Sequence, residues 1–162
     1  MKTAIVTVSD RSFRGERPDL SGPVLQDLVE TEGGIVAHRI TVPDDAKVIA
    51  PVLLGLAETE KCELIITTGG TGLSPRDVTP EATQGVIERR VPGMEEAIRQ
   101  ESLKATPLAM LSRGIAGVRG RTLILNFPGS PKAVRECFAV VKPVLSHAVI
   151  LLKNENPYAV HA

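Results

Sequence analysis

Strand-like hydrophobic segments recur along the first half of the chain. Thr3 to Ser9 is rich in β-branched residues and carries no charge, which predicts a buried strand. Ile35 to Val42 alternates apolar with polar residues and predicts a second, half-exposed strand. Leu64 to Ile66 is apolar at every position, as expected for a central strand of a parallel sheet that is covered on both faces.

The segments between these strands show the spacing of amphipathic helices. One helix is expected to begin at Ser21-Gly22-Pro23 and to stop at Gly33-Gly34. A second is expected over Ala46 to Glu58, with a kink at Pro51 because proline cannot donate the helical hydrogen bond.

The second half of the chain predicts shorter elements. Thr79-Pro80-Glu81 has the composition of a helix start, with Thr79 as the cap, and Pro92-Gly93 is expected to end that helix. Two short helices are expected next, over Met94 to Lys104 and Pro107 to Arg113. Two strands, Ile115 to Val118 and Thr122 to Asn126, are expected to form a hairpin that turns at Arg119-Gly120, and a last helix is expected to be interrupted at Pro143.

This order of elements predicts an α/β fold with a mostly parallel sheet covered by helices on both faces. The length of 162 residues suits one domain, 1–162, in which 153–162 form a flexible tail. In such sheets ligands bind beyond the carboxyl ends of the strands. The loops that follow strands are therefore the places to look for chemistry.

Composition removes several classes of function. Basic and acidic residues balance at 19 each, and aromatic residues make up only 2% of the chain, so a nucleic-acid partner is not expected. No apolar run approaches the ~20 residues that a membrane-spanning helix needs, and the first residues enter a strand directly, which favours a cytoplasmic protein. Cys62 and Cys137 are expected to be reduced, half-buried thiols.

The strongest chemical signal is the segment Thr67-Thr68-Gly69-Gly70-Thr71-Gly72, which directly follows the central strand. Glycines let backbone N–H groups approach an anion closely, and threonine hydroxyls add donors, so this loop is a candidate phosphate or pterin cradle. The alternative is a tight turn that happens to be rich in glycine. The loop is not a P-loop, because no Gly-Lys-Ser/Thr follows it. It is not a dinucleotide-binding fingerprint either, because the third spaced glycine is absent.

Charged residues surround this loop. Arg76 suits a phosphate oxygen, and Asp77 suits a magnesium ion that bridges phosphates. The alternative for Asp77 is a surface helix cap or a partner of an arginine. Asp44 and Asp45 follow the second strand and so should lie at the same edge of the sheet. From the residues alone, capping of the next helix is the favoured role for this pair, with one aspartate left free.

A second strand exit has a similar character. In Pro128-Gly129-Ser130-Pro131-Lys132, Ser130 is expected to cap a helix whose free N–H groups face an anion, and Lys132 adds a charge beside them. The alternative is an ordinary helix start with a solvated lysine. Ser9, Asp10 and Arg11 at the first strand exit are further candidates by position only.

Taken together, these segments resemble the MogA/MoaB family of molybdenum cofactor biosynthesis proteins. The likeness rests on Thr67 to Gly72 with Asp77 and Thr79-Pro80-Glu81-Ala82, and it extends from Ala4 to about Leu152 through the further segments Val8-Ser9-Asp10-Arg11, Val42-Pro43-Asp44, Arg113-Gly114-Ile115-Ala116-Gly117 and Pro128 to Val134. The main departure is Phe127, where leucine is usual.

The resemblance implies a three-layer αβα sandwich, a homotrimer or hexamer, and transfer of AMP from Mg-ATP to the terminal phosphate of molybdopterin. It assigns the two functional carboxylates to Asp44 and Asp77, which would also place Mg²⁺. Expected substrate-binding residues are Ser9, Asp10, Thr68, Gly69, Gly70, Thr71, Gly72, Arg76, Pro128, Gly129, Ser130 and Lys132.

The Arg76-Asp77-Val78-Thr79-Pro80 segment favours a catalytic member of the family, because some MoaB-like relatives lack this arginine. Hand-over of the product to a MoeA-type, molybdate-inserting protein follows from the same resemblance. A non-catalytic molybdopterin-binding paralogue and a different nucleotide-phosphate enzyme stay open, as does the choice between molybdenum and tungsten.

Overall fold

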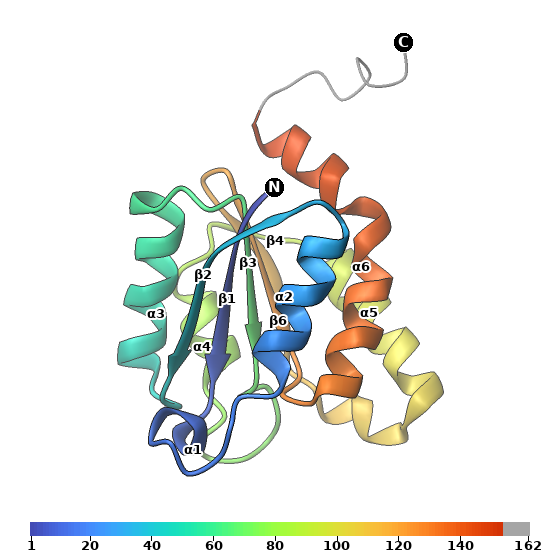
Figure 1. Ribbon diagram of the computed structural model, residues 1–162. Coiled ribbons are helices and arrows are strands. Elements are labelled where there is room, and N and C mark those ends of the chain that lie inside the picture. The colour runs from blue at the N-terminus through green and yellow to red at the C-terminus, as the bar shows by residue number, and fades with distance from the viewer. Residues whose placement is uncertain (154–162) are drawn as a thin grey trace.

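The computed structural model describes residues 1–153, which form helices around one six-stranded sheet (Figure 1). The strand order is β2-β1-β3-β6-β5-β4, and β2, β1, β3 and β6 run parallel, while β5 and β4 are antiparallel to their neighbours. The strands span Lys2–Val8 (β1), Ile35–Val42 (β2), Leu64–Thr68 (β3), Arg89–Arg90 (β4), Ala116–Arg119 (β5) and Thr122–Phe127 (β6). The mostly parallel sheet and the hairpin at Arg119-Gly120 are thereby confirmed.

Helices cover both faces of the sheet. Helices α2, α5 and α6 pack on one face, and α3 and α4 pack on the other, so the three-layer αβα prediction is also confirmed (Figure 1). The helices span Asp10–Phe13 (α1), Ser21–Thr31 (α2), Ala46–Leu54 (α3), Thr79–Gln84 (α4), Pro92–Ala105 (α5) and Pro131–Leu152 (α6), with a π-helical turn over Gly55–Thr59 and a 3-10 turn over Pro107–Leu111.

The alternation of side chains along β1 builds the two halves of the core. Ala4, Val6 and Val8 join the cluster on the α3 side, and Ile5 points into the cluster on the α2 and α6 side. All four are buried, and burying an isoleucine or valine side chain contributes about 1.5–3 kcal/mol. The sheet therefore holds the carboxyl ends of its parallel strands at fixed positions.

Two prolines act differently from the prediction. Pro92 does not end the preceding helix: α4 stops at Gln84, strand β4 follows, and Pro92 lies in the first turn of α5, where its missing N–H has no cost. Pro143 does not interrupt the last helix, because α6 continues to Leu152 with a buried face that stabilises it against the loss of one hydrogen bond. Helix α3 contains Pro51 in its interior, as expected, but it ends at Leu54, and the π-helical turn Gly55–Thr59 completes the predicted segment.

Several smaller expectations also need correction. Thr79 is the first helical residue of α4, and Val78 occupies the cap position. The predicted loop after β1 contains the short helix α1. Cys62 and Cys137 are fully buried rather than half-buried.

No helix within residues 1–153 is both long and apolar enough to cross a membrane. The expected flexible tail, 153–162, lies outside the described residues except for Lys153.

Candidate functional site

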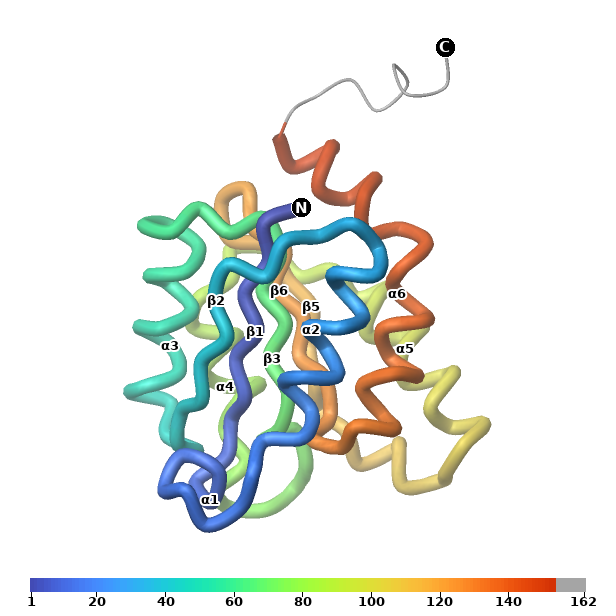
Figure 2. Tube along the Cα trace, in the orientation of Figure 1, coloured from blue at the N-terminus to red at the C-terminus, as the bar shows by residue number. Residues whose placement is uncertain are grey.

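A cleft of about 770 Å³ lies at the carboxyl ends of the parallel strands, a size typical of small-molecule sites. Each strand exit contributes to its lining: Asp10 follows β1, Asp44 follows β2, Gly70 follows β3 and Ser130 follows β6. Figure 2 shows how the chain brings the ends of β1 and β2 together beside α1. Residues as far apart in sequence as Asp10 and Ser130 therefore share one site, because parallel strands end at the same edge.

The glycine loop after β3 requires its glycines for space as well as for backbone conformation. Gly69 has φ +100°, and a Cβ there would lie 2.3 Å from the carbonyl oxygen of Val8. Gly70 has φ +65°, and its Cβ would lie 3.1 Å from Oδ1 of Asp44. A Cβ at Gly72 would lie 2.8 Å from Oδ2 of Asp77. At Gly70 the nearest atom would be the hydroxyl oxygen of Thr79. All three glycines therefore let neighbouring groups pack against the loop backbone, and at Gly70 and Gly72 these groups include the carboxylates of Asp44 and Asp77.

Side-chain and backbone hydrogen bonds hold this loop in place. Thr79 donates its hydroxyl to the carbonyl of Gly69 at 2.9 Å, and the backbone N–H of Gly69 donates to the carbonyl of Phe127 at 3.0 Å. Thr68 is buried and donates its hydroxyl to the carbonyl of Pro128 at 2.8 Å. The loops after β3 and β6 are thus bonded to each other.

Asp10 and Asp44 join the first two strand exits by a reciprocal pair of hydrogen bonds. The backbone N–H of Asp10 donates to Oδ2 of Asp44 at 2.8 Å, and the backbone N–H of Asp44 donates to Oδ1 of Asp10 at 3.0 Å. Asp45 caps α3 by accepting from the backbone N–H of Lys47 at 2.8 Å. The structure therefore leaves Asp44, and not Asp45, facing the cleft.

The electrostatic environment separates these two carboxyl groups. Burial, together with the neighbouring carboxylates of Asp10 and Asp77, raises the pKa of Asp44 above its ordinary value, although the N–H of Asp10 opposes the shift. Partial burial also works to raise the pKa of Asp10, but the N–H of Asp44 and the guanidinium of Arg76 outweigh it and lower that pKa. A cation near Asp44 would relieve the crowding of negative charge.

The segment after the glycine loop brings a third carboxylate to the cleft. Asp77 accepts a hydrogen bond from the backbone N–H of Ser74 at 3.0 Å. Arg76 does not pair with Asp77 but makes two hydrogen bonds of 3.0 Å to the carboxylate of Asp10. Arg113 donates to the carbonyl of Gly72 at 2.8 Å and to that of Asp77 at 2.7 Å, so it connects both ends of this segment.

The exit of β6 matches only part of its prediction. Ser130 caps α6 by accepting from the backbone N–H of Ala133 at 3.2 Å, and Ser130 and Gly129 line the cleft. Pro128 is not among the lining residues. Lys132 is not among them either: its side chain is 81% exposed and lies 3.9 Å from Glu136.

The remaining predicted residues do line the cleft. Ser9 caps α1 through the backbone N–H of Ser12 at 3.2 Å, and Thr71 is buried beside the glycines. Sequence reasoning missed a group of polar residues from the segment between β1 and α2, and Arg11 was only a positional candidate. The missed lining residues include Ser12, Arg14, Arg17, Asp19 and Ser21. The signal available was the high density of polar residues directly after a strand.

The donor set of the cleft is compatible with a metal ion that the substrate shares. Within residues 1–153, no three histidine, cysteine or acidic side chains are arranged to enclose a metal ion. Magnesium commonly binds one or two carboxylates and takes its other ligands from phosphates and water. Asp44 and Asp77 fit that role, because both line the cleft beside the glycines of this loop.

Comparison with known proteins connects this geometry to one family. Residues 4–147 match the family model described as "Probable molybdopterin binding domain". The chain is 49% identical to the molybdopterin biosynthesis enzyme MoaB from Thermus thermophilus, with a TM-score of 0.90 over 95% of this chain and 97% of that one.

Curated relatives give a consistent result. The molybdopterin adenylyltransferase of Haemophilus influenzae is 43% identical over 144 residues, covering 88% of this chain and 73% of the relative. The molybdenum cofactor synthesis protein cinnamon of Drosophila melanogaster is 43% identical over 152 residues. That match covers 93% of this chain, which spans only 25% of the length of cinnamon.

Proposed function

Because the chain belongs to the probable molybdopterin binding domain family, together with the MogA and MoaB proteins, we propose that it is a molybdopterin adenylyltransferase. The substrates would be ATP and molybdopterin. Relatives of about this length are named for that activity, including one at 39% identity of which the match covers 85%. The non-catalytic paralogue is the second candidate.

The proposed reaction is a nucleotidyl transfer without a covalent enzyme intermediate. An oxygen of the terminal phosphate of molybdopterin attacks the α-phosphorus of ATP, a new P–O bond forms, and the bond to the β-phosphate bridging oxygen breaks. Pyrophosphate takes the electron pair of that bond and leaves. The nucleophile is already an anion, so the protein has to position two substrates and offset their negative charges.

The cleft residues divide these tasks. Asp44 and Asp77 would hold Mg²⁺, which when bound neutralises phosphate charge and favours departure of pyrophosphate. Gly70 and Gly72 carry no Cβ, so the loop backbone lies close to these carboxylates, and its N–H groups could approach phosphate oxygens closely. Arg76 would exchange its partner Asp10 for a phosphate when the nucleotide binds.

A single observation carries the proposal: Asp44, Gly70, Asp77 and Ser130 come from separate loops and line the same cleft. Scattered positions would have left no polyphosphate site. The two carboxylates favour an enzyme over a mere pterin binder, because binding alone would gain nothing from negative charges facing a phosphate. Lys132, by contrast, finds no support in this geometry and is left out of the mechanism.

The test is to mix the protein with molybdopterin, Mg²⁺ and labelled ATP and to measure pyrophosphate. Wild-type protein is expected to release it. The Asp77→Asn variant should still bind molybdopterin but should lose adenylylation. Asp45→Asn is the matched control, because Asp45 caps α3 and is not a lining residue. Unchanged turnover in Asp77→Asn would remove Asp77 from the metal site, and binding without pyrophosphate release by wild type would favour the paralogue.

Three further properties belong to the proposal through the resemblance. These are a cytoplasmic location, a homotrimer or hexamer, and transfer of the product to a MoeA-type protein. Light scattering of the purified protein would measure the oligomeric state.

A further inference from the structure

Four arginines line the cleft, and two of them already have carboxylate partners. Arg76 makes its two hydrogen bonds to Asp10. Arg14 donates to Glu16 from Nε at 2.7 Å and from Nη2 at 3.1 Å. The charges of these two guanidinium groups are therefore largely compensated within the protein.

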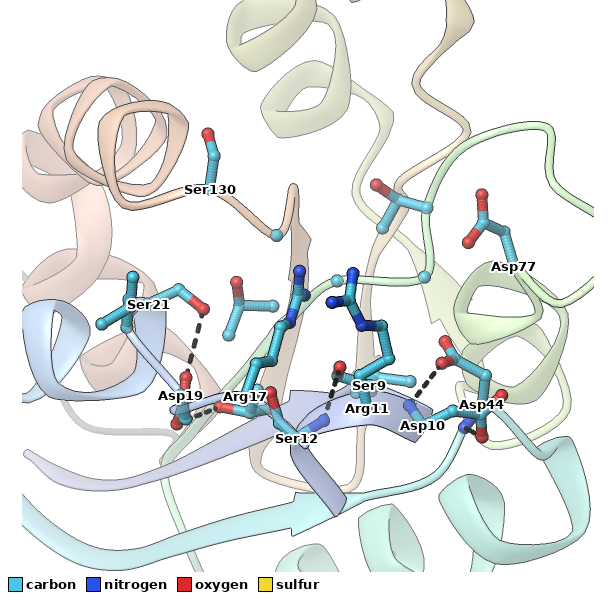
Figure 3. A pocket seen from close by; sticks show the side chains of 18 of the residues that line it. Ser9, Asp10, Arg11, Ser12, Arg17, Asp19, Ser21, Asp44, Asp77 and Ser130 are labelled. Atoms are coloured by element: carbon cyan, nitrogen blue, oxygen red, sulfur yellow. Dashed lines mark hydrogen bonds between the residues drawn. The ribbon is translucent and has the colours of Figure 1, made fainter. Parts of the chain in front are cut away.

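Arg11 and Arg17 differ from the other pair. Neither makes an ion pair or a side-chain hydrogen bond among the residues that the structure describes, and both are exposed. Figure 3 shows both side chains pointing into the hollow between Ser130 and Asp77. Two like charges that point into the same hollow, neither of them in an ion pair, favour an anion that binds both.

The one carboxylate on this side of the cleft is engaged elsewhere. Asp19 accepts from the hydroxyl of Thr7 at 2.8 Å and from the backbone N–H of Gly22 at 2.9 Å, so it acts as a fixed support for the start of α2. The hydroxyls of Ser12, Ser21 and Ser130 line the same part of the cleft and add neutral groups that can donate to an anion.

The cleft therefore has two halves of different character. Asp44 and Asp77 lie together on one side, and Ser21, Asp19 and Arg17 lie toward the other, with Arg11 between them (Figure 3). A metal-bound triphosphate suits the acidic half. In a phosphoryl-type transfer the entering and leaving oxygens are roughly in line across the phosphorus, so the nucleophile has to approach from the opposite half.

We propose that Arg11 and Arg17 together bind the terminal phosphate of molybdopterin, the nucleophile, and hold it opposite the metal-bound end of ATP. The inference rests on the proposed function and deepens it. Two forked guanidinium groups match a phosphate monoester, which offers three oxygens and almost two negative charges. They would take the part that the sequence assigned to Lys132.

The experiment compares Arg11→Gln and Arg17→Gln with Arg121→Gln. Arg121 is also exposed, but it lies at the turn between β5 and β6 and does not line the cleft. The KM for molybdopterin is expected to rise about 10- to 100-fold in Arg11→Gln and in Arg17→Gln, because each loses a charge-assisted hydrogen bond. The KM for ATP should stay close to that of wild type, and Arg121→Gln should change neither constant.

Binding measurements separate this proposal from the proposed function. Titration of molybdopterin into each variant without ATP should show the same loss of affinity, whether or not wild type releases pyrophosphate. Inorganic phosphate should compete with molybdopterin and not with ATP in wild type, and this competition should weaken in Arg17→Gln. A rise in the KM for ATP instead, or unchanged molybdopterin binding in both variants, would overturn the assignment. Arg17→Lys should recover part of the affinity, which a merely folding-related defect would not do.

Discussion

Replacing Arg113 by alanine is expected to slow the proposed adenylyl transfer while the chain stays folded. Arg113 bonds the carbonyls of Gly72 and Asp77 at 2.8 and 2.7 Å, and it also pairs with Glu81. Its backbone N–H donates to the carbonyl of Thr71 at 2.8 Å. The side chain thus fixes the segment that carries Asp77 without lining the cleft itself.

The magnitude follows from these contacts. Each charge-assisted hydrogen bond to a carbonyl contributes about 1.5 kcal/mol at the low end, and the exposed pair with Glu81 contributes about 0.5 kcal/mol. Water can replace part of this, because the side chain of Arg113 is 34% exposed. The variant should therefore lose about 2–3 kcal/mol of the free energy that holds the segment between Gly72 and Asp77 in place. If Asp77 then moves by about 1 Å, kcat should fall about 100-fold.

Arg119→Ala is the matched control. The side chain of Arg119 is 30% exposed, and it also bonds carboxylates, those of Glu58 and Glu88, and one backbone carbonyl, that of Val86 at 3.3 Å. It lies at the β5–β6 turn, at the other end of the sheet from the cleft. Arg119→Ala should lower the thermal unfolding midpoint about as much as Arg113→Ala does, but it should leave kcat unchanged.

The assay is pyrophosphate release under saturating substrates, together with hydrogen exchange of the amides between 72 and 78. Arg113→Lys should recover part of kcat, since an ammonium group can reach one carbonyl but not the forked arrangement. If Arg113→Ala and Arg119→Ala have kcat values within about 3-fold of each other, a difference under about 1 kcal/mol, the segment does not depend on Arg113.

Three other expectations follow from the structure. Gly69→Ala should lower the free energy of unfolding by about 2–3 kcal/mol more than Gly33→Ala, since both have positive φ but only the Cβ at 69 meets a backbone atom, at 2.3 Å; equal losses in chemical denaturation would contradict this. Glu95→Gln should cost about 2–4 kcal/mol at pH 7, because the buried carboxylate bonds Arg90 and Arg99. Burial works to raise the pKa of Glu95, but Arg90 and the other donors outweigh it and lower that pKa below 4.5. The stabilisation by the Glu95 carboxylate is therefore complete above about pH 4.5 and should vanish as the pH falls further. A difference in unfolding free energy between variant and wild type that does not change with pH would refute this. Burial raises the pKa of the Cys137 thiol to about 11, so this thiol should resist alkylation at pH 8 until the protein unfolds.

The sequence could predict the strands because the pattern of apolar and polar residues along each strand shows which of its faces are buried. Leu64 to Ile66 is apolar on both faces, and all of β3 is buried between two helical layers. Prolines were harder to place. Pro92 and Pro143 are compatible with a helix start, a helix end or a helix interior, and the choice depends on tertiary packing that the local sequence does not contain.

The site shows the same distinction between local and distant information. Ser130 as a cap and the open backbone of the glycine loop depend on neighbouring residues, and both are present as expected. Lys132 was assigned to the cleft by its position beside Ser130, but helical geometry turns its side chain away toward Glu136. Periodicity could have indicated this, since Lys132 follows the cap by two residues on a helix whose buried face begins at Val134.

Charge pairing, rather than composition, determines where the cleft can hold an anion. The chain has equal numbers of acidic and basic residues, and its cleft contains both acidic and basic side chains. The net charge of the chain and the mixed charge of the cleft therefore do not by themselves indicate a phosphate site. The bonds of Arg76 to Asp10 and of Arg14 to Glu16 compensate two of the four arginines. Of the other two, Arg17 lies on the side away from Asp44 and Asp77, and Arg11 lies between the two sides. A protein that brings two polyanions together needs such a separation, because a uniformly basic cleft would bind both substrates anywhere, whereas a divided one gives each substrate a side and fixes the direction of attack.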